Sequence, residues 1–179
     1  MGSSELSNHF RYAGLDECEF VNGEGVGVTI YFQGCTHRCP GCHNPQTWDS
    51  EGGMIFGVSE LQKVQAWLAD EHIQRITMSG GDPFDNIEML TYLLIYIGLH
   101  NISGKKIWVY TGYTYEELIA KGYKPMLAQI DYLVDGRYIK ELRDLSIAFR
   151  GSSNQRIIDC KQSLADDRIV IINLDQEAD

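Results

Sequence analysis

Three cysteines lie within eight residues of this chain, at Cys35, Cys39 and Cys42. Their spacing, with three residues and then two between them, lets one short loop wrap around a single metal centre. Pro40 and Gly41 tighten the turn between the last two cysteines. Iron–sulfur clusters are bound by cysteine thiolates, of which four is the usual number. A loop that supplies only three leaves one iron open to another ligand, much as a catalytic zinc keeps an open position.

Two other metal sites fit the same three cysteines. His37 or His43 could complete a Cys3His zinc site, which would make the chain a binding module without catalysis. Cys18 or Cys160 could instead complete a four-thiolate cluster, as in a ferredoxin-like electron carrier; otherwise both are expected to be buried as small hydrophobic residues. His37 and Arg38, lying between ligands, could also tune a cluster through hydrogen bonds or simply face solvent. Structural zinc usually supports small domains with little core, whereas this chain is long enough for an ample core, which favours the cluster.

A second group of residues, Ser79, Gly80, Gly81 and Asp82, follows a short apolar stretch. Paired glycines after a strand let a ligand approach the backbone closely, and the adjacent carboxylate can accept hydrogen bonds from a ligand amine. The alternative is a plain turn before a helix, since Gly-Asp-Pro is a common turn sequence. No Gly-Lys-Ser/Thr follows the glycines, so the segment is not a phosphate-binding loop of the Walker type.

The elements that must position these segments follow from the hydrophobic pattern. Runs rich in β-branched and aromatic residues predict strands at 26–33, 74–78, 107–111, 130–134 and 168–173. Helices are expected to begin at capping boxes at 59–62 and 114–117, and near residue 85. Alternation of strands and helices is typical of right-handed βαβ units around a parallel sheet. The chain has 179 residues, fewer than the roughly 200 of a closed eight-fold barrel. We therefore expect an α/β fold, either a partial, open βα barrel with a mostly parallel sheet or a doubly wound sheet.

Four polar or glycine-rich segments come directly after predicted strands, at residues 34–44, 79–83, 112–113 and 135–137. In both architectures ligands bind at the carboxyl ends of the parallel strands. These four segments are therefore expected to converge on one mouth. Tyr110, Thr111 and Tyr113 could touch a cofactor there or form an edge of the aromatic core. Residues 150–155 are too polar for a core and predict either a docking segment for a partner or a solvated turn.

Composition limits the remaining possibilities. A hydrophobic fraction of 44% over 179 residues predicts one globular domain, 1–179, with a short lead-in at 1–11 and an acidic tail at 175–179. The net charge of −10 argues against broad nucleic-acid binding. No apolar run reaches the ~20 residues of a membrane span, and the first residues do not resemble a secretory signal. Cytoplasmic localisation is the expectation.

The cysteine loop followed by His43 and Asn44, together with Ser79-Gly80-Gly81-Asp82, resembles the radical S-adenosylmethionine superfamily. Within it, the chain is most similar to the small enzymes that activate glycyl-radical enzymes. The resemblance extends over nearly the whole chain, from about residue 12 to about residue 172. The chain resembles the activating proteins of anaerobic (class III) ribonucleotide reductase in four stretches, residues 20–23, 39–45, 134–138 and 149–156.

The resemblance implies a radical S-adenosylmethionine fold and a set of ligands. Cys35, Cys39 and Cys42 would bind three irons of a [4Fe–4S] cluster, and the open iron would chelate the amino and carboxylate groups of S-adenosylmethionine. The remaining cofactor-binding positions implied are Gly41, Cys42 and His43 beside the adenine, Gly80, Gly81 and Asp82 at the methionyl amino group, and Ser79 and Tyr110. Asp82 stands where glutamate is common, and Gly41 stands where many members carry an aromatic residue.

The resemblance also implies an activity and its partners. Reductive cleavage of S-adenosylmethionine would give methionine and a 5′-deoxyadenosyl radical, which would abstract hydrogen from a glycine of the large subunit of anaerobic ribonucleotide reductase. The electron would come from a donor such as flavodoxin or a thioredoxin-type system. The alternative partner is another glycyl-radical enzyme of the pyruvate formate-lyase type, although the activases of that type are longer.

Overall fold

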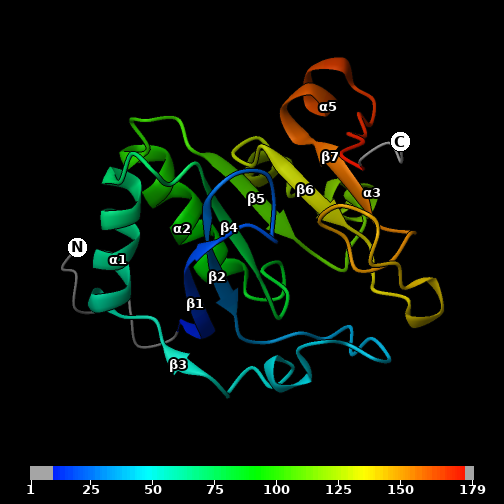
Figure 1. The fold of residues 1–179 in the computed structure, drawn as a ribbon, viewed down its shortest axis with the longest axis horizontal. Helices are drawn as coiled ribbons and strands as arrows, with labels where there is room; N and C mark the ends of the chain where they lie inside the picture. Colours follow the sequence, from blue (N-terminus) through cyan, green and yellow to red (C-terminus); the bar gives the residue numbers. More distant parts are fainter. Residues whose placement is uncertain (1–9, 176–179) are drawn as a thin grey trace.

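A computed structural model describes residues 10–175, which form an α/β fold around one seven-stranded sheet (Figure 1). The strands follow one another across the sheet in the order β3-β1-β2-β4-β5-β6-β7. Their bounds are β1 Arg11–Glu19, β2 Gly27–Phe32, β3 Met54–Ile55, β4 Arg75–Gly80, β5 Lys106–Tyr110, β6 Tyr132–Asp135 and β7 Arg156–Asp159.

The four central strands β2, β4, β5 and β6 run parallel, as the alternation of strands and helices predicts. The flanks differ from the expectation, because β1 pairs antiparallel with both β2 and β3, and β7 pairs antiparallel with β6. Since β3 and β7 end the strand order, the sheet is open. The expected open α/β architecture with a parallel sheet at its centre is therefore confirmed.

Residues 10–175 contain five α-helices, of which the first four lie between strands and the last follows β7: α1 Val58–Ala69, α2 Ile87–His100, α3 Tyr115–Ala120, α4 Lys124–Leu127 and α5 Cys160–Asp166. Figure 1 shows α1 and α2 beside the half of the sheet that contains β1, β2 and β4, and α5 beside β7. The predicted capping box at Thr114 is present, because Thr114 Oγ1 accepts the Glu117 N–H at 3.2 Å. The one expected at Ser59 is displaced: α1 begins at Val58, and Glu60 instead accepts the N–H of Gly57 at 2.8 Å.

All five helices contribute buried residues to the core on one face of the sheet. Along the strands, side chains alternate between faces, so Val28 and Ile76 belong to this core while Thr29 and Thr77 point the other way. The opposite face has a small apolar cluster of Trp108, Val134 and Ile157 that contains no residue of a helix. A loop therefore has to cover the rest of this face.

That loop connects β1 to β2 and lies over a buried ion pair of the two strands β1 and β4. Arg75 on β4 is fully buried and donates to Glu19 at 2.5 Å, and Thr29 donates to the same carboxylate at 2.7 Å. Burial raises the pKa of Glu19, but these hydrogen bonds outweigh it and hold the pKa at about 2. Asn22, in the 20–23 stretch, accepts a hydrogen bond from Thr77 at 2.9 Å. The loop is thus fastened to the sheet by polar contacts.

Several predicted elements need correction. Residues 168–173 are not a strand: they make an isolated bridge, Ile158 to Ile171, beside β7, which the hydrophobic pattern missed. β1 was missed because two register shifts interrupt its pairing and its outer half is exposed. The expected lead-in at 1–11 is too long by at least one residue, because Arg11 already belongs to β1. The expected tail at 175–179 begins with a residue that is held by the fold, because Asp175 pairs with Arg150. Residues 1–9 and 176–179 lie outside the described part of the chain. No helix within residues 10–175 has the length and apolar character needed to span a membrane.

Candidate functional site

One pocket at the carboxyl ends of β2, β4, β5 and β6 collects residues from all four segments that the sequence placed there. In Figure 1 the segment that follows β2, light blue to cyan, runs along the lower edge of the molecule. Predicted site residues that line the pocket are Cys35, Cys39, Cys42, Ser79, Gly80, Gly81, Asp82 and Tyr110. Other lining residues are His37, Thr47, Trp48, Thr111, Gly112, Gly136, Tyr138 and Gln155.

Two predicted residues do not line this pocket. Gly41 has a φ of +75° and packs against the side chain of Lys140. His43 is exposed, and its ring lies 5.4 Å from the ring of Tyr138. Both residues flank Cys42, which does line the pocket, so any contact they make with a ligand there has to come from the backbone next to Cys42.

Backbone hydrogen bonds hold the start of the cysteine loop. The N–H of Gly34 donates to Thr47 O at 2.8 Å and the N–H of Cys35 donates to Trp48 O at 3.2 Å. On the other side, the Asp82 N–H donates to Gly34 O at 2.8 Å. The loop therefore continues the direction of β2 and passes between the segment that follows it and the end of β4.

The two glycines after β4 are explained by this packing. Gly80 has a φ of +99°, a conformation that favours glycine. A Cβ at Gly81 would lie closer than 3.0 Å to the backbone of Gly34. The Gly80-Gly81 pair therefore lets the cysteine loop and the end of β4 come into direct backbone contact, whatever further role it has for a ligand.

Within the loop, the conformation between the cysteines is strained at one residue. Arg38 has a φ of +47°, in the left-handed region that is uncommon for residues other than glycine. The next turn is closed by the Cys42 N–H, which donates to Cys39 O at 3.1 Å. The Asn44 N–H then donates to the sulfur of Cys42 at 3.4 Å. Forming the turns that orient the cysteine sulfurs therefore costs conformational energy at Arg38.

Burial favours the neutral thiol at two of the three cysteines. It raises the pKa of Cys35 to about 11, assisted by the charges of Asp82 and Asp85 and opposed by the backbone N–H groups of His37 and Arg38. Burial also raises the pKa of Cys39. Metal binding has to displace these protons. Among residues 10–175, no three Cys, His, Asp or Glu side chains converge closely enough to hold a single metal ion.

The carboxylate of Asp82 is the centre of the pocket wall and is 1% exposed. One of its oxygens accepts the Phe84 N–H and the Thr111 hydroxyl, both at 2.9 Å. The other accepts the Gly112 N–H at 2.7 Å and faces His37 Nε2 at 2.9 Å. Asp82 therefore joins the cysteine loop to the ends of β4 and β5.

The donors around the pocket suit an iron–sulfur cluster. Thiolates are the ligands that such clusters prefer, and their sulfur atoms accept hydrogen bonds. Trp48 lines the pocket beside Cys35, and its indole Nε1 is buried with no hydrogen-bond partner among the described residues. A buried donor without a partner is costly, so a sulfur acceptor in the pocket would satisfy it.

The mouth is closed on its far side by the segment after β6. Tyr110, which is half-buried, donates its hydroxyl to Phe149 O at 2.8 Å. Gln155 accepts the Gly151 N–H at 2.8 Å and donates to Gly136 O at 2.9 Å. Residues 150–155, left open between a docking segment and a solvated turn, therefore form a braced turn next to the pocket.

The two remaining cysteines are far from this mouth. Cys160 is fully buried in the core, as expected, and begins α5 next to Asp159, which pairs with Tyr132 at the amino end of β6. Cys18 is exposed, contrary to the expectation that it is buried. It sits near the amino end of β2, and the five residue steps of that strand span ~17 Å. Neither residue lines the pocket of the three cysteines.

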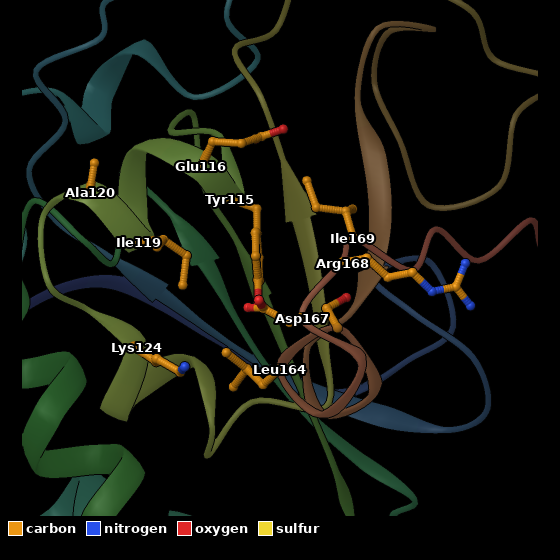
Figure 2. A pocket seen from close by; sticks show the side chains of 10 residues that line it. Tyr115, Glu116, Ile119, Ala120, Lys124, Leu164, Asp167, Arg168 and Ile169 are labelled. Carbon is orange, nitrogen blue, oxygen red and sulfur yellow. The ribbon is translucent and has the colours of Figure 1, made fainter.

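A separate groove of about 330 Å³ lies between α3 and α5 (Figure 2). Ile119 of α3 and Leu164 of α5 lie on two sides of it, whereas Arg168 extends away. It includes none of the residues that the sequence predicts for chemistry.

Comparison with known proteins agrees with this arrangement. A family described as "4Fe-4S single cluster domain" matches residues 21–158. The chain is 39% identical over 153 residues to a Haemophilus influenzae protein, covering 84% of this chain and 96% of the relative. It is 34% identical over 148 residues to an Enterobacteria phage T4 protein, covering 82% and 92%, and 38% identical over 152 residues to an Escherichia coli protein, covering 83% and 96%. All three carry the name anaerobic ribonucleoside-triphosphate reductase-activating protein. The chain belongs to the family of anaerobic ribonucleoside-triphosphate reductase-activating proteins, with a 4Fe-4S single-cluster domain over most of its length.

Proposed function

We propose that this protein is a radical S-adenosylmethionine activase with a [4Fe–4S] cluster on Cys35, Cys39 and Cys42. Its target would be the large subunit of anaerobic ribonucleotide reductase, on which it would generate a glycyl radical. The observation that carries the proposal is that these three cysteines line one pocket with Ser79, Gly80, Gly81 and Asp82, while Cys18 and Cys160 lie elsewhere. Three thiolates leave one iron free for a substrate.

The chemistry would divide between the cofactors and the chain. When bound, the reduced cluster would supply the one electron that divides S-adenosylmethionine into methionine and a 5′-deoxyadenosyl radical, the species that would take a hydrogen atom from a partner glycine. The chain's own residues hold and shield the reactants. The cysteines would bind iron, the ends of β4 and β5 would form the wall beside the methionyl group, and the braced 150–155 turn would exclude water from one side; all three line or border the one pocket.

The partner is proposed from the family. Relatives that match more than four-fifths of this chain are named as activating proteins of anaerobic ribonucleoside-triphosphate reductase. The electron would reach the cluster from a donor such as flavodoxin or a thioredoxin-type system. Activation of a pyruvate formate-lyase type enzyme is the second candidate, since the same radical chemistry would serve it.

The test begins with protein reconstituted anaerobically with iron and sulfide. With dithionite and S-adenosylmethionine we expect 5′-deoxyadenosine from the wild type and none from Cys39→Ala. Cys18→Ala is the matched control, because Cys18 is exposed outside the pocket, and it should keep both iron and activity. Loss of the cluster in Cys18→Ala or Cys160→Ala would instead indicate a four-thiolate carrier. One zinc per chain and no iron after anaerobic purification would indicate a zinc module.

The partner is tested separately by electron paramagnetic resonance. The reduced activase and S-adenosylmethionine are incubated with the reductase or with a pyruvate formate-lyase. We expect a glycyl radical signal on the reductase. A signal on the lyase alone would overturn this choice of partner without affecting the cleavage chemistry.

A further inference from the structure

The side chain of His37 is buried although it lies in the middle of the cysteine loop. It is 4% exposed, whereas its neighbours Thr36 and Arg38 are exposed. His37 is also the residue midway between Cys35 and Cys39. A buried side chain at this point fixes the path of the loop between two cysteines.

The space that holds the His37 ring is built from the ends of β4 and β5. Its Nε2 lies 2.9 Å from Asp82 Oδ2, and its ring meets the ring of Tyr113 edge-on at a centroid distance of 4.4 Å. Gly112 forms the floor of this space, because a Cβ there would lie closer than 3.0 Å to the His37 ring. One hydrogen bond, one aromatic contact and one glycine thus define a slot for this imidazole.

Asp82 has little capacity left for a ligand. A carboxylate offers about four acceptor positions. Its two oxygens already accept the Phe84 and Gly112 N–H groups, the hydroxyl of Thr111 and the imidazole of His37. An ammonium group could approach only by displacing one of these donors from a carboxylate that is 1% exposed. The bonding pattern is that of a residue that positions other parts of the protein.

A second contact anchors the same turn. Thr36 donates its backbone N–H and its hydroxyl to Asp85 Oδ2 at 2.6 and 2.8 Å, and Tyr113 donates to the other oxygen of Asp85 at 2.7 Å. Thr36, His37 and Arg38 lie between Cys35 and Cys39, so anchoring this turn also fixes the backbone N–H groups between two of the proposed cluster ligands.

We propose that His37 is the positioning residue that seats the cysteine loop on the sheet, and that Asp82 acts through His37 rather than by binding the amino group of S-adenosylmethionine. The inference deepens the proposed function and rests on it, because it concerns the same cluster loop. Hydrogen bonds to cluster sulfurs set the reduction potential of a cluster. The placement of His37 in its slot therefore contributes to this potential as well as to iron retention.

Three variants disrupt the binding of the His37 side chain in its slot in different ways. His37→Phe keeps the ring contact with Tyr113 and removes the bond to Asp82, whereas Asp82→Asn replaces an acceptor by a donor that faces the Gly112 N–H. Gly112→Ala changes neither His37 nor Asp82. Its added methyl group fills the floor of the slot and forces the imidazole out. His37→Gln retains a donor and serves as the conservative rescue. His72→Phe is the matched control, because His72 is exposed.

The measurements are made on reconstituted protein without S-adenosylmethionine. We expect all three disruptive variants to lose iron to a chelator roughly 10- to 100-fold faster than wild type, as removal of groups that orient metal ligands does. Their clusters should also have a more negative midpoint potential. The double variant His37→Phe with Asp82→Asn should lose iron no faster than the worse single variant, because both break one contact. His37→Gln should recover part of the retention, and His72→Phe should match wild type.

One pattern would overturn the inference. If Asp82→Asn retains iron and potential like wild type but raises the KM for S-adenosylmethionine, Asp82 contacts the cofactor directly. Thermal unfolding of the metal-free variants shows whether a loss of iron reflects a general loss of fold, and Gly112→Ala and His37→Gln remain informative if His37→Phe does not fold. A wild-type protein that holds its cluster but makes no 5′-deoxyadenosine would refute the proposed function while leaving the iron-retention test intact.

Discussion

Gly81 lies against the backbone of Gly34, so that a Cβ at residue 81 would come closer than 3.0 Å to the carbonyl group of Gly34. The atoms it would meet are backbone atoms of the segment that carries the first cysteine, and they cannot rotate away as a side chain can. Asp82 donates its N–H to the same Gly34 oxygen at 2.8 Å. This contact couples the position of the cysteine loop to the end of β4.

Gly81→Ala is therefore expected to displace the cysteine loop. We expect a loss of iron retention and a destabilisation of the metal-free protein by roughly 1–3 kcal/mol, in the range of overpacking substitutions. Urea unfolding and iron analysis after reconstitution measure the two effects. Gly98→Ala is the control, because a Cβ there has 3.8 Å to its nearest neighbour and lies within α2. It should keep iron and gain up to about 1 kcal/mol of stability. Equal behaviour of the two variants would contradict the role of the Gly81 contact.

The sequence predicted the parallel centre of the sheet and the convergence of four loops because those features follow from local pattern. β2 is rich in β-branched and aromatic residues and is buried at every position except Tyr31, as strands inside parallel sheets are. β1 could not be predicted in the same way, because register shifts and an exposed outer half remove its periodicity. The cysteines were identified by spacing alone, and the structure brings all three to one pocket.

The burial of the His37 side chain could not be predicted from the sequence, because it depends on residues far apart in the chain. The sequence left His37 undecided between a zinc ligand, a hydrogen-bonding role and solvent exposure. Its burial depends on Asp82, 45 residues away, and on the absence of a side chain at Gly112. Trp48 gave no pattern signal either, because a buried donor without a partner is a property of packing. A glycine directly after the predicted strand at 107–111 was the available hint of a close approach.

The buried pair of Arg75 and Glu19 predicts an acid-sensitive fold. Hydrogen bonds hold the pKa of Glu19 at about 2 in the folded protein, below its ordinary value of 4.5. Its stabilising contribution is therefore complete above about pH 4.5 and is lost as the pH falls toward about 2. In urea unfolding of metal-free protein, we expect the deficit of Glu19→Gln to be largest at pH 7 and to shrink at pH 3. A deficit independent of pH would rule out this linkage.

Removal of either member of this pair leaves a buried charge without its partner. Arg75→Met leaves the Glu19 carboxylate buried without its main partner, which typically costs about 3–5 kcal/mol. Because Arg75 and Glu19 act as one unit, the double variant Arg75→Met with Glu19→Gln should be more stable than Arg75→Met alone. Urea unfolding of the metal-free protein at pH 7 measures both. An additive double variant would show that the two residues act independently.

Arg156 connects two carboxylates of very different burial next to the pocket. Its Nε donates to Asp135 at 2.9 Å, where Asp135 is 1% exposed, and its NH2 donates to the exposed Glu116 at 2.7 Å. Arg156→Gln should destabilise the metal-free protein by about 3–5 kcal/mol, because Asp135 loses its cation in a buried place. Glu116→Gln removes a surface partner and should cost less than about 1 kcal/mol. Similar losses in the two variants, by urea unfolding, would mean that burial of Asp135 does not decide the energetics.

Trp48 offers a test of the cluster environment in which the stability of the fold and the midpoint potential of the cluster should respond differently. Trp48→Phe keeps an aromatic ring beside Cys35 and removes an indole N–H that has no acceptor among residues 10–175. In metal-free protein the change should be close to neutral or slightly stabilising, because an unsatisfied buried donor disappears. In the reconstituted protein we expect a more negative midpoint potential, because a sulfur acceptor loses a hydrogen bond. Trp67→Phe, at a buried position of α1, should do the reverse, with lower stability and an unchanged potential. A potential that stays at the wild-type value in Trp48→Phe would show that the indole N–H does not reach the cluster.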